Sequence, residues 1–409
     1  FIFLIVLKTT NGDKIKGFAS GLLFITFTSK VWYVSGFSEI YCLLFLSLSI
    51  YLFVVSKNNQ KICFLIGILI SLSSLVNLAS ALFLIPFLLS YFQRKSISYP
   101  TKKIYSMILG FILPHIIVVL VYFNNGILDI HFANYVTMPL GYTSDESLSS
   151  LYELRVWLRE MFYFNNFLYF SLFSLLIFYI TSNYKELKKT VLDFYVLSIF
   201  ISLAIYFIGS HNYYHHLFYF IFFVPFLISK ILNKKYIYLL ISLIFIASIN
   251  SFTYSYKDSF SNLQSLDSTL NEYPLYQLSQ EIDSYFDNDY SVFALDYVMV
   301  LHYLKKQNFS YIVHPMNHFA DFITIPLTEL GKISDDNVQR LLDQSPDVII
   351  CNTSMIIDGI EERIDGEYIC ELESFGMDYF QLNTDEFREN SNLFYFKDPV
   401  RVLNVFIKK

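Results

Sequence analysis

Apolar runs of the length that crosses a lipid bilayer recur along roughly the first 255 residues of this chain, and short loops with lysine and arginine separate them. A helix needs about 20 apolar residues to cross the hydrocarbon core, and the core helices of a soluble protein do not recur at this length and frequency. The composition agrees, because 55% of the residues are hydrophobic and only 16% are charged. The pattern therefore predicts a polytopic α-helical membrane protein.

The apolar runs predict about nine full transmembrane helices plus a partial first one. The predicted spans are 17–34, 39–55, 61–75, 78–92, 104–123, 162–181, 190–208, 215–231 and 236–252. The spans 61–75 and 78–92 are short and adjacent, so we expect one kinked hairpin, with a re-entrant functional element as the alternative. Too few apolar residues precede Lys8 for a complete span, so a first helix and a first loop are expected upstream.

Lysine and arginine are distributed unequally between the loops on alternate sides. One side holds Lys8, Lys14, Lys16, Lys57, Lys61, Arg94, Lys95, Lys102, Lys103, Lys185, Lys188, Lys189, Lys230, Lys234 and Lys235. The other side has Lys30, Arg155 and Arg159, so the positive-inside rule predicts that the first side is cytoplasmic. We therefore expect an integral protein of a prokaryotic inner or plasma membrane, with its C-terminal part on the non-cytoplasmic side.

From about Lys257 the pattern becomes that of a small α/β domain, so the predicted domains are 1–252, in the membrane, and 253–409, extracytoplasmic. The predicted helices are 276–285, 298–307 and 335–343. The predicted strands are 290–295, 309–313, 346–351, 368–372 and 393–396, and a last apolar segment covers 400–406. No glycine-rich phosphate loop occurs, so nucleotide binding is not expected there.

Charge and cysteine content argue against several classes of partner and cofactor. The net charge is −6, which does not indicate a nucleic-acid-binding surface. The four cysteines are Cys42, Cys63, Cys351 and Cys370. Their spacing supports neither a zinc site nor a disulfide framework. A single disulfide between Cys351 and Cys370 in an oxidising compartment is the alternative. No cofactor is expected, and a requirement for a divalent metal is not indicated.

Polar residues near the outer ends of the predicted spans are the candidate site. An ionisable side chain there is costly unless it has a partner or lines a wet cavity. The candidates are Lys30, Glu39, Arg155 and Arg159 in a predicted interfacial helix, and His211, His215 and His216. Each alone is typical of an interface anchor or a structural ion pair. A group of cations beside aromatic residues is instead typical of a site for a phosphorylated, membrane-borne ligand.

Several of these segments resemble a known family. Gly209–Leu227, which reads GSHNYYHHLFYFIFFVPFL, resembles the segment of dolichyl-phosphate-mannose-protein mannosyltransferase-like enzymes where an outer loop enters a helix through a His-Tyr pair, an apolar run and Pro-Phe-Leu. Gly36–Glu39 is similar to the acidic position of that family at the start of an outward-facing helix. The later order is similar too, with the helix at Leu109–Pro114, the outer loop at Gly126–Asp129 and the tail with Pro346–Ile350.

The resemblance implies a GT-C-fold glycosyltransferase that takes a sugar from a polyprenyl-phosphate donor, itself a membrane lipid, and transfers it to an envelope lipid, glycan or protein acceptor on the outer face. It implies a general-base Asp in the first outer loop, which is expected upstream of Phe1. The residues implied to bind the donor phosphate and stabilise it as it leaves are Lys30, Arg155, Arg159, His211, His215 and His216. Glu39 would orient a cation or the sugar.

Two other functions stay open. An envelope polysaccharide polymerase or ligase also has many spans and a large outer loop. It acts on diphosphate-linked substrates, however, and usually lacks a tail of about 150 residues, which is the length of a whole domain. A transporter or channel needs charged residues near the middle of its spans, where this chain is almost entirely apolar. The pattern therefore favours the glycosyltransferase.

Overall fold

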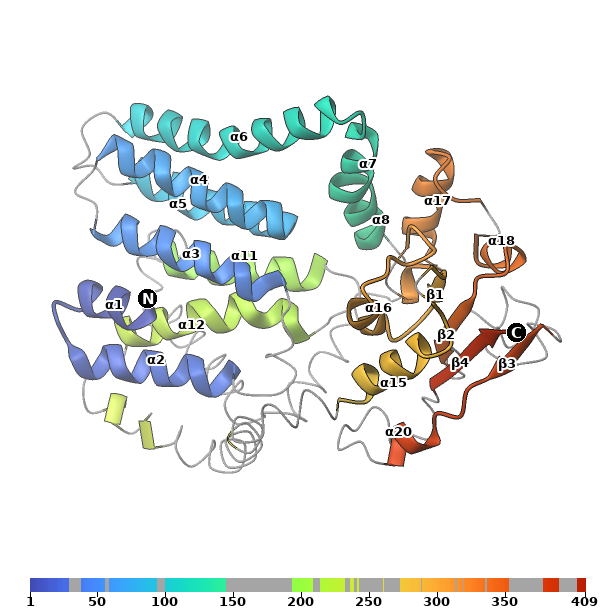
Figure 1. Ribbon diagram of the computed structural model, residues 1–409. Helices are drawn as coiled ribbons and strands as arrows, with labels where there is room; N and C mark the ends of the chain where they lie inside the picture. Colours follow the sequence, from blue (N-terminus) through green and yellow to red (C-terminus); the bar gives the residue numbers. More distant parts are fainter. Residues whose placement is uncertain are drawn as a thin grey trace. The chain divides into compact units, whose positions relative to one another are not determined.

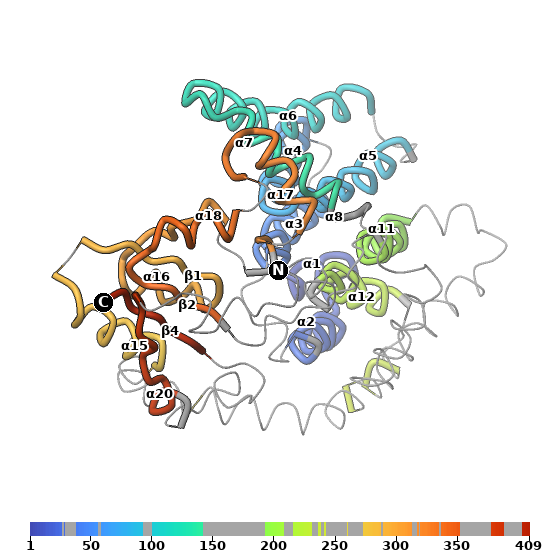
Figure 2. Tube along the Cα trace, turned by 90° about the vertical axis from the view of Figure 1, so that its right-hand side faces the viewer, coloured from blue at the N-terminus to red at the C-terminus, as the bar shows by residue number. Residues whose placement is uncertain are grey.

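The computed structural model describes most of the predicted membrane part and most of the C-terminal part. The described residues are 1–28, 38–55, 59–93, 100–144, 193–208, 214–231, 236–238, 241–242, 260, 273–287, 289–312, 315–318, 320–334, 337–352, 378–389 and 403–409. The chain forms two compact units (Figures 1 and 2). Unit 1 comprises Phe1–His131 and Tyr142–Asp258, and unit 2 comprises Phe132–Gly141 and Ser259–Lys409.

Unit 1 is a bundle of apolar helices. Its elements are α1 (Ile2–Thr9), α2 (Lys14–Thr28), α3 (Ser38–Val55), α4 (Gln60–Val76), the 3-10 turn η2 (Leu78–Phe83), α5 (Leu84–Gln93), α6 (Pro100–Asn124), α11 (Phe194–Ile208), the 3-10 turn η5 (Tyr214–Leu217) and α12 (Phe218–Ile231). Helix α4 packs against α3 and α6, and α12 packs against α2 and α11. Figure 1 shows these helices running alongside one another.

Two of these helices, α3 and α6, are long and apolar enough to cross a membrane, judged by length and composition. The predicted apolar runs 61–75, 78–92, 190–208 and 215–231 are also helical, but their helices are shorter. The predicted span 162–181 and nearly all of 236–252 lie outside the described residues. Among the residues that the structure describes there are therefore two candidate spans, which is a coarser result than the nine that the sequence predicts.

The predicted hairpin of two short helices is present. Asn77 interrupts the helix after α4, and its side-chain oxygen accepts a hydrogen bond from the Ala79 N–H at 3.1 Å, which caps the turn η2. The Cys63 thiol donates to the Tyr91 hydroxyl oxygen at 3.2 Å. Because Cys63 is near the start of α4 and Tyr91 near the end of α5, the two helices run antiparallel.

Helices α4 and α6 touch backbone to backbone at two glycines. A Cβ added at Gly67 would lie 2.0 Å from the Met107 carbonyl oxygen, and a Cβ added at Gly110 would lie 2.0 Å from the Phe64 carbonyl oxygen. Only a residue without a side chain allows this approach, which is how small residues let apolar helices pack closely in membranes. Glycine is scarce in this chain, at 13 of 409 residues, and two of the 13 are used at this crossing.

Unit 2 contains a four-stranded sheet of β1 (Val292–Ala294), β2 (Val348–Asn352), β3 (Tyr379–Gln381) and β4 (Leu403–Lys408), in the order β1-β2-β4-β3. Strand β1 is parallel to β2, and β4 is antiparallel to both β2 and β3. The remaining elements of the unit are α15 (Pro274–Asp283), α16 (Met299–Leu304), the 3-10 turn η6 (Pro315–His318), α17 (Asp321–Glu329), α18 (Asn337–Asp343) and α20 (Asp385–Glu389).

Alternate strand residues bury the two faces of the sheet, as the period of two in a strand requires. Val292 and Val348 pack with the apolar side chains of α15 and α16 on one face. Phe293 and Ile349 pack with α18 on the other face. On this second face, burial near Asp347 raises the pKa of Tyr379, so its hydroxyl stays protonated and donates to the Pro346 carbonyl oxygen at 2.6 Å.

Most predicted elements of the C-terminal part are confirmed, with shifted ends, as α15, α16, α18, β1 and β2, and the last apolar segment, for which no element was predicted, forms β4. The predicted strand 309–313 is wrong over its described residues, which form a bend. The reason is Asn308, whose side chain takes the place of a strand partner. Its amide nitrogen donates to the Ala294 carbonyl oxygen at 3.1 Å, and its amide oxygen accepts from the Ala294 N–H at 3.0 Å. The predicted strands 368–372 and 393–396 lie outside the described residues.

Candidate functional site

Glu39 lies in the first turn of α3 and is buried, with only 2% of its surface exposed. One carboxylate oxygen accepts a hydrogen bond from the Asn77 amide at 3.0 Å, and the other accepts one from the Ser38 hydroxyl at 3.2 Å. Within the part of the chain that the structure describes, no lysine or arginine forms an ion pair with Glu39. The start of the helix, with its free N–H groups, favours a negative charge at this position.

Two further hydroxyl groups lie fully buried near this carboxylate. Tyr219, in α12, and Ser80, in η2, are both next to the Cys42 thiol, and Glu39 is within electrostatic range of the Tyr219 hydroxyl. Apart from this thiol, neither hydroxyl has a hydrogen-bond partner among the described residues. We call this group the Glu39 cluster. Its members are Ser38, Glu39, Cys42, Asn77, Ser80 and Tyr219.

The polar contacts continue from the cluster across α4 to α6. The Cys42 thiol donates to the Ser73 carbonyl oxygen at 3.3 Å. The next residue, Ser74, is hydrogen-bonded through its hydroxyl to Nε2 of His115 at 2.9 Å. An imidazole inside an apolar helix is costly without such a partner. His115 is thus a polar group that reasoning from the sequence missed, although its place in a predicted span is the signal that could have found it.

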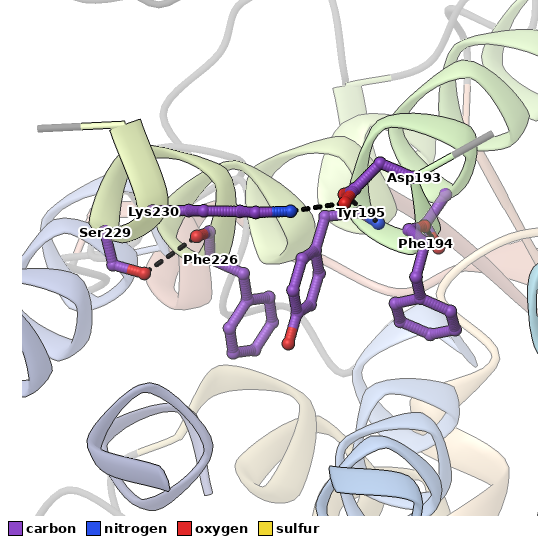
Figure 3. A network of polar contacts seen from close by, with 7 residues as sticks. Asp193, Phe194, Tyr195, Phe226, Ser229 and Lys230 are labelled. Carbon is purple, nitrogen blue, oxygen red and sulfur yellow. Dashed lines mark hydrogen bonds and ion pairs between the residues drawn. The ribbon is translucent and has the colours of Figure 1, made fainter. Parts of the chain in front are cut away.

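The opposite ends of the same helices carry the lysines, and we call this side of unit 1 the lysine end. Lys16, in the first turn of α2, donates to the Ser229 carbonyl oxygen in the last turn of α12 at 2.8 Å. Lys230 forms an ion pair with Asp193, at the start of α11 (Figure 3). Asp193 also accepts a hydrogen bond from the Tyr195 N–H at 3.2 Å. Lysines of the adjacent helix starts are Lys61, Lys102 and Lys103.

The structure describes only part of the predicted site. Lys30, Arg155, Arg159 and His211 lie outside the described residues, as does the side chain of His215. His216 is partly buried in η5, directly before the helix that carries Tyr219. Two of the predicted site residues, Glu39 and His216, therefore lie on neighbouring elements. Glu39 is on α3, His216 is in the turn that leads into α12, and α3 contacts α12.

Asn77, Ser80 and Tyr219 were not predicted as site residues. Asn77 had a usable signal, because it is a polar residue between the apolar runs 61–75 and 78–92. Tyr219 is one aromatic among many in its segment, and nothing local distinguishes it. The described residues contain no group of His, Cys, Asp or Glu that could hold a metal ion. What the cluster offers chemically is a buried carboxylate with two hydroxyl groups, which suits ligands that carry hydroxyl or ammonium groups.

Comparisons of the chain with protein-family models, with curated proteins and with solved structures find no match.

Proposed function

We propose that this chain is a membrane glycosyltransferase of the GT-C type that transfers a sugar from a polyprenyl-phosphate donor to an envelope lipid, glycan or protein on the outer face of the membrane. The observation that carries the proposal is the Glu39 cluster, in which a buried carboxylate lies with buried hydroxyl groups at the end of the bundle opposite the lysines. A buried acidic group in an apolar bundle costs free energy unless it serves a ligand or a partner. The cluster is therefore a candidate for the sugar side of the reaction.

Membrane insertion of unit 1 is supported by the outward side of α6. Leu109, Ile117 and Phe123 are each more than half exposed there, and a helix with an exposed apolar face is stable in lipid but prone to associate in water. The nine-span topology remains part of the proposal. Under the positive-inside rule, the lysine end faces the cytoplasm, and the Glu39 cluster then lies toward the outer face, where lipid-linked sugars act as donors.

The phosphate and the sugar of the donor require different residues to bind them. The departing polyprenyl phosphate is an anion, and the cations Lys30, Arg155 and Arg159, with a protonated histidine of the segment 211–216, would stabilise its charge as the bond breaks. Glu39 would repel that phosphate and accept hydrogen bonds from sugar hydroxyls or an amino group. Tyr219 and Ser80 supply hydroxyls that donate to or accept from the same sugar. The acceptor hydroxyl loses its proton to a carboxylate base, as general-base catalysis requires.

The first test is a transfer assay on the full-length natural protein in lipid nanodiscs, with polyprenyl-phosphate sugars as donors and envelope lipid as acceptor. Glu39→Gln should lower kcat/KM by about 10–100-fold, since a hydrogen bond to a charged group contributes about 1.5–3 kcal/mol. Glu386→Gln, which changes an exposed carboxylate of α20 in unit 2, is the matched control and should keep the wild-type rate.

Two results would count against the proposal. Activity on diphosphate-linked oligosaccharides, without activity on monophosphate donors, would identify a polymerase or ligase instead. A wild-type rate in Glu39→Gln would mean that this carboxylate has a structural role only, and the site would have to be sought elsewhere.

A further inference from the structure

The described helices that begin at the lysine end of unit 1 differ in the charge of their first turns. The starts of α2 and α11 carry aspartates. Asp13 accepts hydrogen bonds from the Ile15 and Lys16 N–H groups at 3.1 and 3.2 Å, and Asp193 accepts one from the Tyr195 N–H at 3.2 Å. A carboxylate at this position stabilises a helix, because the free N–H groups carry partial positive charge. The chain itself therefore supplies the negative charge at these two helix starts.

The starts of α4 and α6 carry lysines instead. Lys61 lies in the first turn of α4, Lys102 and Lys103 lie in the first turn of α6, and neither turn contains an acidic residue. The cap of α4 is the neutral Asn59, whose side-chain oxygen accepts from the Lys61 N–H at 2.9 Å. The sequence has no Asp or Glu from residue 40 to residue 128. Because a lysine at a helix start opposes the helix dipole, a bound anion would stabilise both starts.

These two helix starts lie side by side. The Ser106 hydroxyl of α6 donates to the Gln60 carbonyl oxygen of α4 at 3.0 Å, and the Lys103 ammonium is within electrostatic range of the Cys63 thiol. Lys103 is only 7% exposed, whereas the other two lysines are exposed. The three residues therefore belong to one positively charged surface. We call it the α4–α6 lysine patch, and its members are Lys61, Lys102 and Lys103.

An exposed apolar surface continues from the patch along both helices. Leu65, one turn after Lys61, is 42% exposed, and Tyr105 and Leu109, which follow Lys102 on α6, are 66% and 61% exposed. Spacings of three and four residues place these groups on the helix faces that carry the lysines. Tyrosine is typical of the membrane–water interface. A soluble anion would match the lysines alone, whereas a lipid matches both the lysines and the apolar residues beyond them.

We propose that the α4–α6 lysine patch binds the headgroup phosphate of an anionic phospholipid in the cytoplasmic leaflet, with its acyl chains along Leu65 and Leu109. Basic sites between membrane helices on the cytoplasmic side suit such headgroups. The phosphate supplies the negative charge that Asp13 and Asp193 supply at the other two helix starts. This inference goes beyond the proposed sugar transfer, because it requires that unit 1 is inserted in the membrane but does not involve the reaction.

The experiment measures lipid binding to the full-length natural protein in detergent. The protein is titrated with phosphatidylglycerol or with phosphatidylcholine of the same chains, and bound lipid is counted by native mass spectrometry. Phosphatidylglycerol should bind at least about tenfold more tightly, and added salt should weaken its binding. Lys61→Gln and Lys102→Gln should each weaken it about fivefold. Lys61→Arg, which keeps the charge, should bind the lipid as the wild type does.

Two controls isolate the site. Lys8→Gln removes an exposed lysine from the same end of the bundle, but this residue lies in the last turn of α1, where a cation suits the helix dipole. It should bind phosphatidylglycerol as the wild type does. Soluble glycerol phosphate has the phosphate without the acyl chains, so it should not displace the lipid. Without lipid, every variant should unfold at the temperature of the wild type.

Three results would overturn the inference. Equal affinity for the two lipids would show that the patch does not select an anionic headgroup. An equal loss of binding in Lys8→Gln would mean that the whole lysine end attracts lipid without a site. Displacement by glycerol phosphate would identify a site for a soluble phosphate instead. No sugar donor enters these measurements, so a protein that binds the lipid but transfers no sugar refutes only the proposed function.

Discussion

At the scale of single residues, Asn77 both caps a turn of the backbone and hydrogen-bonds the carboxylate of the Glu39 cluster. Its amide nitrogen donates to Glu39 at 3.0 Å and to the Ser38 hydroxyl oxygen at 3.2 Å, while its amide oxygen caps η2 through the Ala79 N–H. One side chain therefore ends α4, starts the next turn and holds the carboxylate of α3. Few residue types can do this, because both a donor and an acceptor are needed at one position.

Asn77→Ala should lower the free energy of unfolding by about 2–4 kcal/mol, of which about 1 comes from the lost cap and about 1–3 from leaving a buried acceptor without its donor. Asn77→Asp keeps the cap but brings a second carboxylate against Glu39, so it should also destabilise the protein. Asn125→Ala is the matched control, since the Asn125 amide donates to the Val121 carbonyl oxygen at an exposed site, and it should stay within about 0.5 kcal/mol of the wild type.

Unfolding can be followed through the chain's own thiols. Cys42 and Cys63 are free and fully buried in unit 1, so a thiol-reactive dye reports the opening of the bundle. If Asn77→Ala unfolded at the same point as the wild type, the assigned contacts would contribute nothing to stability.

At the scale of elements, the crossing of α4 and α6 is the tightest contact described between helices of unit 1. Gly67 also approaches the backbone nitrogen of Phe111, which an added Cβ would meet at 2.8 Å. The partner atoms belong to the helix backbone, so they cannot turn away as the end of a side chain can. The two helices would have to move apart.

Gly67→Ala and Gly110→Ala should each destabilise unit 1 by at least about 1–3 kcal/mol, the range for overpacking a close contact. The double variant should cost less than the sum, because the first substitution already separates the helices. Gly21→Ala, in α2, is the control, since an added Cβ there meets nothing within 4 Å and alanine favours a helix by up to about 1 kcal/mol. Equal stability of all three variants in the dye assay would refute the close crossing.

The elements also show which parts of the fold the sequence predicts and which it does not. Apolar runs predicted the helices of unit 1, and short apolar segments bounded by turn residues predicted β1 and β2, because both signals are local. Helix α17 was missed because Pro326 and the β-branched residues before it are typical of a strand end or a loop. Glu39 was predicted from its charge, whereas its hydrogen-bond donor Asn77 and its neighbour Tyr219 reach it only through tertiary packing of distant segments.

At the scale of the whole molecule, the two units share the chain in an interleaved order that the sequence does not predict. The segment Phe132–Gly141 lies between two stretches of unit 1 in the sequence, and only its packing against Ile312 and Leu327 shows that it belongs to unit 2. A disulfide adds a second indication about unit 2. Cys351 is disulfide-bonded, while Cys42 and Cys63 are free, and Cys370 lies outside the described residues. Disulfides persist in oxidising compartments, which agrees with the proposed extracytoplasmic side for unit 2.

The last prediction tests on which side of the membrane unit 2 and the lysine end of unit 1 lie, by introducing cysteines at exposed positions. Gln344→Cys, after α18 in unit 2, should react with a membrane-impermeant maleimide in intact spheroplasts, whereas Lys61→Cys, at the lysine end of α4, should react only after lysis. The unsubstituted chain, treated in parallel, gives the native background, to which Cys42 and Cys63 should contribute little because they are buried. Reaction of Lys61→Cys alone before lysis would invert the topology. The Glu39 cluster would then face the cytoplasm, away from an outer-leaflet donor, and the proposed function would fail at the level of the whole molecule.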